Sequence, residues 1–109
     1  MKVGGIDPGH VVDREGNRYL YVDKGEVIRL TEDGLATVGE KKKVYDGWKY
    51  PDHWDTECMC LESPKLNEHN GYYYLTSAQG GTAGPATSHM VVSARSKSVI
   101  GPWEDSPYN

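Results

Sequence analysis

Two stretches of the chain share one order of features, and this internal repeat restricts the fold more than any other part of the sequence. In IDPGHVVDREGNRYLYV and in LESPKLNEHNGYYYLTS, a carboxylate close to a proline is followed by a short strand, a polar turn and an aromatic strand. Asp7 and Glu62 occupy matching places 55 residues apart, and Tyr19 and Tyr73 are 54 residues apart. The two copies therefore have a nearly constant period.

The composition favours strands over helices. Thirteen glycines, six prolines and eight tyrosines accompany few apolar runs of helical length, which is typical of short strands joined by tight turns. A period near 50 residues with about four short strands in each unit is typical of a β-propeller blade. We expect an all-β chain with two blades, approximately residues 5–55 and 56–109, and strands at residues 10–12, 18–23, 27–30, 43–45, 65–67, 72–77, 90–94 and 102–104. Two blades cannot close a ring, so the chain is expected to be part of a larger propeller.

One turn is predicted from local chemistry alone. Asn70-Gly71 suits the positive φ values of a two-residue hairpin loop, and strand-like residues flank it on both sides. We expect a hairpin over residues 65–77. In a propeller the first strand of each blade lies at the central axis, so Asp7 and Glu62 would face one another there and could form an acid/base site.

Charge and hydropathy exclude several classes of partner. A net charge of -4 offers no surface that neutralises phosphates, and Lys41, Lys42 and Lys43 are interpreted as a solvated turn, so no nucleic-acid partner is expected. No apolar run is long enough to cross a membrane, and the start MKVGGIDPG lacks the apolar segment of a signal peptide. Within this chain we therefore expect neither a membrane span nor an export signal.

Cys58 and Cys60 are the only cysteines. On an extended chain, side chains two residues apart point to the same face without the close approach that a disulfide needs. We expect two half-buried thiols. A metal site would need further ligands, and C-x-C with His53 nearby lacks the spacing of a structural zinc site.

Taken together, the motifs resemble a known enzyme family. IDPG-x-x-x-D-x-x-G-x-x-Y-L-Y, then ESPKL, GYYYLTSAQGGT and ARSKS-x-x-GPWE resemble glycoside hydrolase family 43, and the likeness runs from Gly5 to Asn109. The resemblance implies a five-bladed propeller that hydrolyses β-xylosides or α-L-arabinofuranosides of xylan- or arabinan-type polysaccharides and oligosaccharides with inversion. It also implies three acidic residues: a general base, an aspartate in an I-D-P context that tunes and orients the acid, and a general acid in an E-x-P context.

Two of these three positions have a match in the chain. Asp7 matches the aspartate that modulates the pKa of the acid, and Glu62 matches the general acid, which must hold its proton near neutral pH. Glu57 competes with Glu62, but only Glu62 has a proline two residues later. The general base has no candidate here, so the isolated chain is expected to be inactive.

Further residues are candidates for substrate contact. The loop GWKYPDHWDTE precedes the strand of Glu62, and Trp54 and His53 could line a pocket there, although a tryptophan more often packs in a core. The resemblance implies that QGGTAGPATSHM borders the substrate cleft, which makes Thr87, Ser88 and His89 candidates. An ordinary turn histidine is an equally good interpretation of His89. Arg95 is interpreted as a structural residue that binds a carbonyl or a carboxylate.

Other properties stay open at this level. The resemblance allows a structural metal ion on the propeller axis, for which the chain shows no ligand set, and it leaves export or cytoplasmic retention undecided. A propeller that binds carbohydrate without catalysis, with Asp7 and Glu62 bonding only sugar hydroxyls, is the alternative from another class. A third interpretation is a related five-bladed hydrolase family that acts on other glycosides or on fructans.

Overall fold

Two four-stranded antiparallel sheets make up the structure. The computed structural model describes residues 4–5, 7–54, 58–80 and 90–109. The first sheet has the order β1-β2-β3-β4, with β1 (Gly9–Val12), β2 (Arg18–Val22), β3 (Glu26–Leu30) and β4 (Thr37–Lys43), and a short 3-10 turn, η1 (Asp23–Gly25), joins β2 to β3. The second has the order β5-β6-β7-β8, with β5 (Glu62–His69), β6 (Tyr72–Gln79), β7 (Met90–Ser96) and β8 (Glu104–Asp105). The predicted all-β architecture is confirmed.

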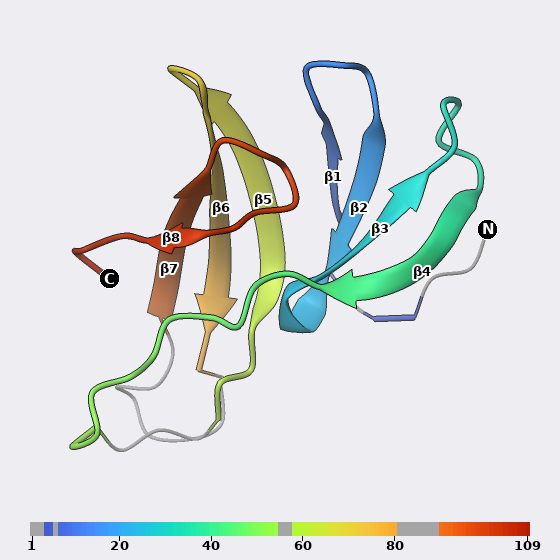
Figure 1. Ribbon diagram of the computed structural model, residues 1–109. Helices are drawn as coiled ribbons and strands as arrows, with labels where there is room; N and C mark the ends of the chain where they lie inside the picture. Colours follow the sequence, from blue (N-terminus) through green and yellow to red (C-terminus); the bar gives the residue numbers. More distant parts are fainter. Residues whose placement is uncertain (1–3, 6, 55–57, 81–89) are drawn as a thin grey trace.

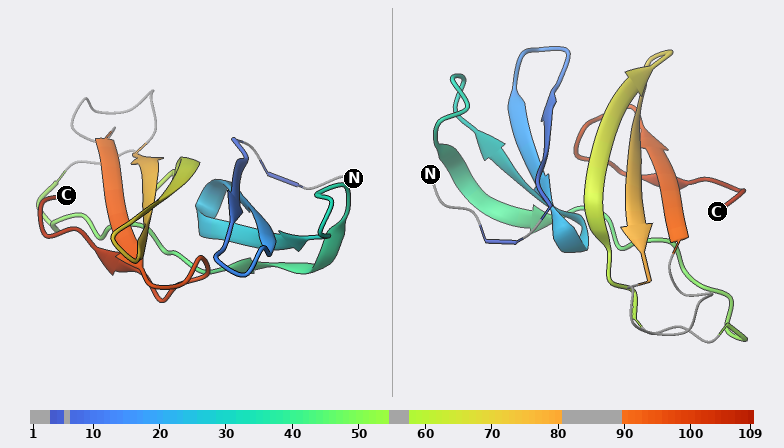
Figure 2. Two further views of the ribbon diagram at one scale, coloured as in Figure 1. Left: turned by 90° about the horizontal axis from the view of Figure 1, so that it is seen from above. Right: turned by 180° about the vertical axis from the view of Figure 1, so that it is seen from behind.

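The two sheets stand next to each other with their first strands adjacent. Figure 1 shows β1 and β5 rising in the same direction in the middle of the molecule, while β4 and the β7–β8 pair lie toward opposite sides. The views of Figure 2 show the same arrangement. Successive meandering sheets whose first strands adjoin have the arrangement of neighbouring propeller blades. The precise residue at which one blade ends and the next begins stays a prediction.

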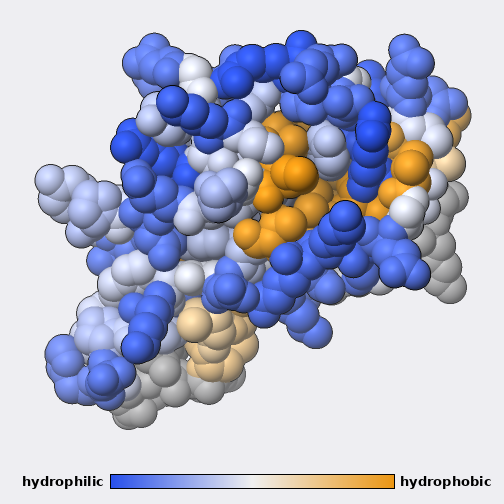
Figure 3. Space-filling model, in the orientation of Figure 1, coloured by the Kyte–Doolittle hydropathy of each residue, from blue (hydrophilic) through white to orange (hydrophobic). Residues whose placement is uncertain are grey.

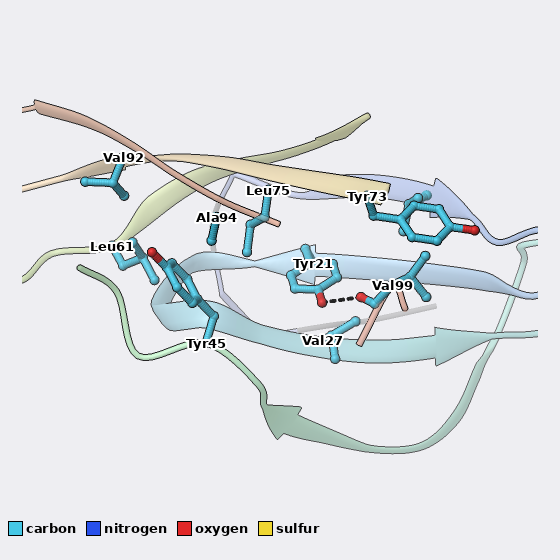
Figure 4. Close-up of a cluster of buried hydrophobic side chains, with 10 residues drawn as sticks. Tyr21, Val27, Tyr45, Leu61, Tyr73, Leu75, Val92, Ala94 and Val99 are labelled. Carbon is cyan, nitrogen blue, oxygen red and sulfur yellow. Dashed lines mark hydrogen bonds between the residues drawn. The ribbon is translucent and has the colours of Figure 1, made fainter. Parts of the chain in front are cut away.

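A hydrophobic core lies between the sheets. Tyr21 and Val27 of the first sheet pack with Tyr73 and Leu75 of the second, and Tyr21 and Leu75 are almost fully buried. Figure 4 shows the Tyr21 hydroxyl pointing to the backbone oxygen of Val99, to which it donates a hydrogen bond.

The predicted hairpin is confirmed in detail. Asn70 and Gly71 have φ values of 51° and 84°, and His69 pairs with Tyr72 directly across them. Two positive φ values at the centre of a two-residue loop are those of a type I′ turn, which Asn-Gly favours. In the strand that follows, buried and partly exposed side chains alternate as expected, because Tyr73 is buried while Tyr72 and Tyr74 face the other way.

Two predicted strands are displaced along the chain, and others are longer than expected, such as the fifth, which was expected at residues 65–67 and runs over Glu62–His69. The fourth was expected at residues 43–45 but runs over Thr37–Lys43, so Lys41, Lys42 and Lys43 belong to a strand and not to a turn. Lysines suit this strand because β4 is an edge, where charged side chains discourage pairing with another chain. The last strand was expected at residues 102–104 and is the short β8.

The surface of the two sheets carries both apolar and hydrophilic side chains. Figure 3 shows apolar side chains gathered near the middle of one face, bordered by hydrophilic ones. Val38 and Ile100 are each about half exposed, at 47% and 48%. Among the described residues there is no helix of the length and hydropathy that would cross a membrane.

Candidate active site

The structure brings Asp7 to the beginning of the strand that carries Glu62. Asp7 lies two residues before β1, and Glu62 is the first residue of β5, the neighbouring strand (Figure 1). Ser63, directly after Glu62, donates a hydrogen bond from Oγ to Asp7 Oδ2 at 3.1 Å. The segments that carry Asp7 and Glu62 therefore meet, although they lie far apart in the sequence.

The backbone on both sides of this contact has an uncommon conformation. Asp7 and Ser63 each have a φ of 53°, and each precedes a proline, which ordinarily favours an extended residue. The left-handed region costs a residue with a side chain roughly 1–2 kcal/mol. Such conformations persist only where surrounding contacts hold them, and they are enriched at functional sites.

The position of β5 is determined by contacts with the first sheet. The N–H of Lys24 in η1 donates to the carbonyl oxygen of Leu61 at 2.8 Å, which holds the residue directly before Glu62. Between Glu62 and Lys65 the register of β5 with β6 shifts, so the strand contains an irregularity where Glu62 is presented. Bulges of this kind commonly re-aim a side chain beside an active site.

Two aspartates in turns of the first sheet have structural roles. Asp13 Oδ1 accepts hydrogen bonds from the N–H groups of Asn17 and Glu15, and Asp33 Oδ1 accepts from Thr31 Oγ1. Burial acts to raise the pKa of Asp13, but the hydrogen bonds from Asn17 and Glu15 outweigh it and hold that pKa below its ordinary value. The Thr31 hydroxyl lowers the pKa of Asp33 in the same manner. Both carboxylates stabilise turns, as their sequence context predicts.

Three aromatic rings form a cluster in the loop that leads toward β5. Trp48 lies 5.4 Å from Trp54 and 5.8 Å from Tyr50, measured between ring centroids, and Tyr50 and Trp54 are also 5.8 Å apart. All three side chains keep part of their surface accessible, whereas His53 is exposed. The structure therefore places Trp54 in a half-buried aromatic cluster and its sequence neighbour His53 on the exposed surface. Neither placement tests whether these side chains bind sugar.

A buried glutamine holds this loop. The fully buried side chain of Gln79, at the end of β6, donates from Nε2 to the carbonyl oxygen of Trp48 at 2.6 Å and accepts from the N–H of Trp48 at 2.9 Å. The Gln79 amide thus bonds both the N–H and the carbonyl oxygen of Trp48, as the backbone of a neighbouring strand would. Sequence reasoning did not identify Gln79 or Ser63, because both contacts join segments that are distant in the chain; the E-S-P motif was the only signal for Ser63.

The predicted state of the two cysteines is wrong. Cys58 and Cys60 are joined by a disulfide, with their Cα atoms 5.3 Å apart. Cys60 has a φ of 39°, so the chain is not extended there, as the prediction assumed. The neighbouring Met59 carbonyl oxygen accepts a hydrogen bond from the N–H of Gly80, which ties this segment to the end of β6.

Several candidates lie outside the described residues. These are Glu57, which competed with Glu62, and Thr87, Ser88 and His89 of the glycine-rich loop. Arg95 is described and has the predicted structural role, since its Nε lies 2.9 Å from Glu104 Oε1 and its guanidinium lies over the ring of Tyr72.

The described residues form no metal site of their own. Within the four described segments, no group of three or more His, Cys, Asp or Glu side chains could hold a metal. No chemical step is therefore assigned to a metal in this chain.

Comparisons with known proteins agree on one family. The model of the family described as Glycosyl hydrolases family 43 matches residues 1–109. A xylan 1,3-beta-xylosidase of Vibrio sp is 40% identical over 117 residues, covering 96% of this chain and 20% of that protein, and an extracellular endo-alpha-(1->5)-L-arabinanase of Bacillus subtilis is 31% identical, covering 92% and 30%. The crystal structure of the family 43 protein BlXynB from Bacillus licheniformis matches with a TM-score of 0.77 and 35% identity, over 96% of this chain and 19% of that one.

The chain spans about a fifth of the length of most of the curated relatives it matches. The structural match confirms the expected fold, about two blades of a five-bladed β-propeller. The match over the whole chain also decides against the related hydrolase family that the sequence had left open. The chain belongs to glycosyl hydrolases family 43.

Proposed function

We propose that this chain supplies two blades of an inverting glycosidase, with Glu62 as the general acid and Asp7 as the residue that tunes and orients it. The observation that carries the proposal is the hydrogen bond between Ser63 and Asp7, which joins the residue beside Glu62 to the beginning of the neighbouring inner strand. Two carboxylates from successive blades thus lie at one end of adjacent strands (Figure 1).

The reaction assigns a separate role to each group. Glu62 gives a proton to the departing glycosidic oxygen, so the leaving group departs as an alcohol. A water molecule attacks the anomeric carbon from the opposite side of the sugar, and a second carboxylate removes its proton. In inverting enzymes these two carboxyls stand about 6.5–9.5 Å apart to admit the water. We assign the base to a blade outside this chain. Asp13 and Asp33 are committed to turns, and Asp46, Asp52 and Asp55 lie in the loop before Glu62 without the sequence context of the base.

The substrate class is inferred from the relatives. Those named above are called a xylan 1,3-beta-xylosidase and an endo-alpha-(1->5)-L-arabinanase, so we propose that the substrate is a xylan- or arabinan-type polysaccharide or an oligosaccharide derived from it. Trp54 offers an aromatic face on which a sugar ring can stack. We further propose His53, Ser88 and His89 as polar contacts to sugar hydroxyls.

Product stereochemistry tests the proposal. The full-length enzyme that carries this chain should release xylose or arabinose whose first-formed anomer is inverted relative to the substrate, as proton NMR would record within the first minutes. A first-formed anomer of unchanged configuration would contradict the mechanism. Saturable binding of xylo-oligosaccharides with no release of sugar would instead support the carbohydrate-binding alternative.

A further inference from the structure

Ser63 has an uncommon backbone conformation, and its side chain bonds a residue that is distant in the sequence. Its backbone lies in the left-handed region, with a φ of 53°, where glycine would be relaxed and serine is not. Its hydroxyl donates to Asp7 Oδ2 across 56 residues of sequence at 3.1 Å. A hydroxyl that bonds an ionised carboxylate forms one of the stronger kinds of hydrogen bond.

The contact adds a side-chain bond to backbone contacts that already hold the two segments together. The start of β5 is held by the bond from the N–H of Lys24 to the Leu61 carbonyl oxygen. The start of β1 lies against the backbone of Pro64, because a Cβ built on Gly9 would be 2.1 Å from the Pro64 carbonyl oxygen. Neither backbone contact determines where the exposed carboxylate of Asp7 points. The hydrogen bond from the Ser63 side chain fixes that direction.

We propose that Ser63 is a positioning residue of the active site, which holds the Asp7 carboxylate against the strand of Glu62. The inference rests on the proposed glycosidase function and deepens it. Ser63 acts through Asp7, so the removal of its hydroxyl lets the Asp7 side chain rotate away while Glu62 and the sugar contacts stay in place.

A double-mutant cycle in the full-length enzyme tests this role. Ser63→Gly removes the hydroxyl and relieves the backbone, whereas Ser63→Ala removes the hydroxyl and keeps the Cβ. Both variants should lower kcat on xylobiose by about tenfold with little change in KM, because a hydrogen bond to a charged group is lost. The loss on an aryl xyloside with an activated leaving group should be smaller, since that substrate needs little protonation.

The decisive result is the behaviour of Ser63→Gly in an Asp7→Ala background. If Ser63 acts through Asp7, the second substitution has no further effect on kcat there. Independent losses that multiply would overturn the inference. The matched control is Ser106→Ala, which removes a serine hydroxyl from a turn near β8 and should leave kcat unchanged.

A purely structural role would give a different pattern. It would lower the unfolding midpoint of Ser63→Gly and reduce the activity on both substrates equally, and that outcome also overturns the inference. If the parent hydrolyses no glycoside, the proposed function fails on its own. The same cycle, measured as urea midpoints, then judges the Ser63–Asp7 contact: non-additive shifts support it and additive shifts refute it.

Discussion

The backbone of Gly9 touches the backbone of Pro64 so closely that a side chain on Gly9 cannot fit. A Cβ built there would lie 2.1 Å from the Pro64 carbonyl oxygen, well inside van der Waals contact. Gly9 begins β1, and Pro64 lies in the third position of β5. The two inner strands therefore approach at the point where the proposed catalytic residues are presented.

Gly9→Ala should destabilise the protein and lower activity. The methyl group must push β1 away from β5, and overpacking of this kind costs about 1–3 kcal/mol. Urea unfolding of the full-length enzyme measures the loss, and kcat should fall because Asp7 moves with β1. Gly4→Ala is the control, since its Cβ would meet only the flexible end of Lys41 at 3.4 Å. Equal stability of the two variants would show that the strands can separate without cost.

Gln79→Ala should loosen the loop that carries the aromatic cluster. The substitution leaves the backbone N–H and carbonyl oxygen of Trp48 without the partners they have now, which costs about 1–3 kcal/mol if water cannot reach them. Tryptophan fluorescence should change at urea concentrations below the main transition. Asn67→Ala, which truncates an exposed amide on β5, should leave the fluorescence unchanged. One cooperative transition at the same midpoint in both variants would contradict this role.

Trp54→Ala should weaken the binding of oligosaccharides more than it slows catalysis. Loss of the aromatic face removes a stacking surface, and KM for xylo-oligosaccharides should rise by about tenfold, which corresponds to about 1.4 kcal/mol. Steady-state kinetics with substrates of increasing length provide the measurement. Tyr108→Ala is the control, because Tyr108 is 93% exposed and far along the chain from this loop. An unchanged KM for Trp54→Ala would assign Trp54 to packing alone.

The protein should lose stability at alkaline pH. Burial raises the pKa of Tyr21 and of Tyr45, and the Asp105 carboxylate, which accepts the Tyr45 hydroxyl at 2.6 Å, raises the pKa of Tyr45 further. In the unfolded chain each phenol titrates near pH 10. The contribution of each phenol to stability is therefore fully present below about pH 10 and is lost as the pH rises toward the folded pKa.

Urea unfolding between pH 8 and pH 11 measures this loss. Each buried phenol should steepen the decline by up to about 1.4 kcal/mol per pH unit above pH 10. Tyr45→Phe should make the decline shallower, and Tyr108→Phe, at an exposed position, should not. The same slope in all three proteins would mean that the phenols ionise freely in the folded state.

Local signals in the sequence predicted much of the fold. Asn70-Gly71 and the alternating strand after it determine a hairpin by their own chemistry, and the repeat of such units predicted two blades. The fourth strand was misplaced because an edge strand is set by pairing with its neighbour and carries lysines that also suit a turn. The disulfide was missed because the positive φ of Cys60 has no sequence signal in a residue other than glycine.

The candidate site was predictable only in part. Asp7 and Glu62 were chosen as candidates because each lies close to a proline at the same place in a repeat. Ser63 and Gln79 act through contacts that cross 56 and 31 residues, and no local pattern reports which distant groups will meet. The role of Ser88 and His89 stays a prediction, because both lie outside the described residues.

The dependence of Glu62→Gln on the leaving group tests the central claim most directly. Glutamine keeps the shape of the side chain but has no proton to give. In the full-length enzyme, kcat/KM should fall by about 10²–10⁴-fold on xylobiose and far less on an aryl xyloside with an activated leaving group, while Glu68→Gln, an exposed residue of the same strand, changes neither. Equal losses on both substrates would contradict the assignment of Glu62 as the general acid.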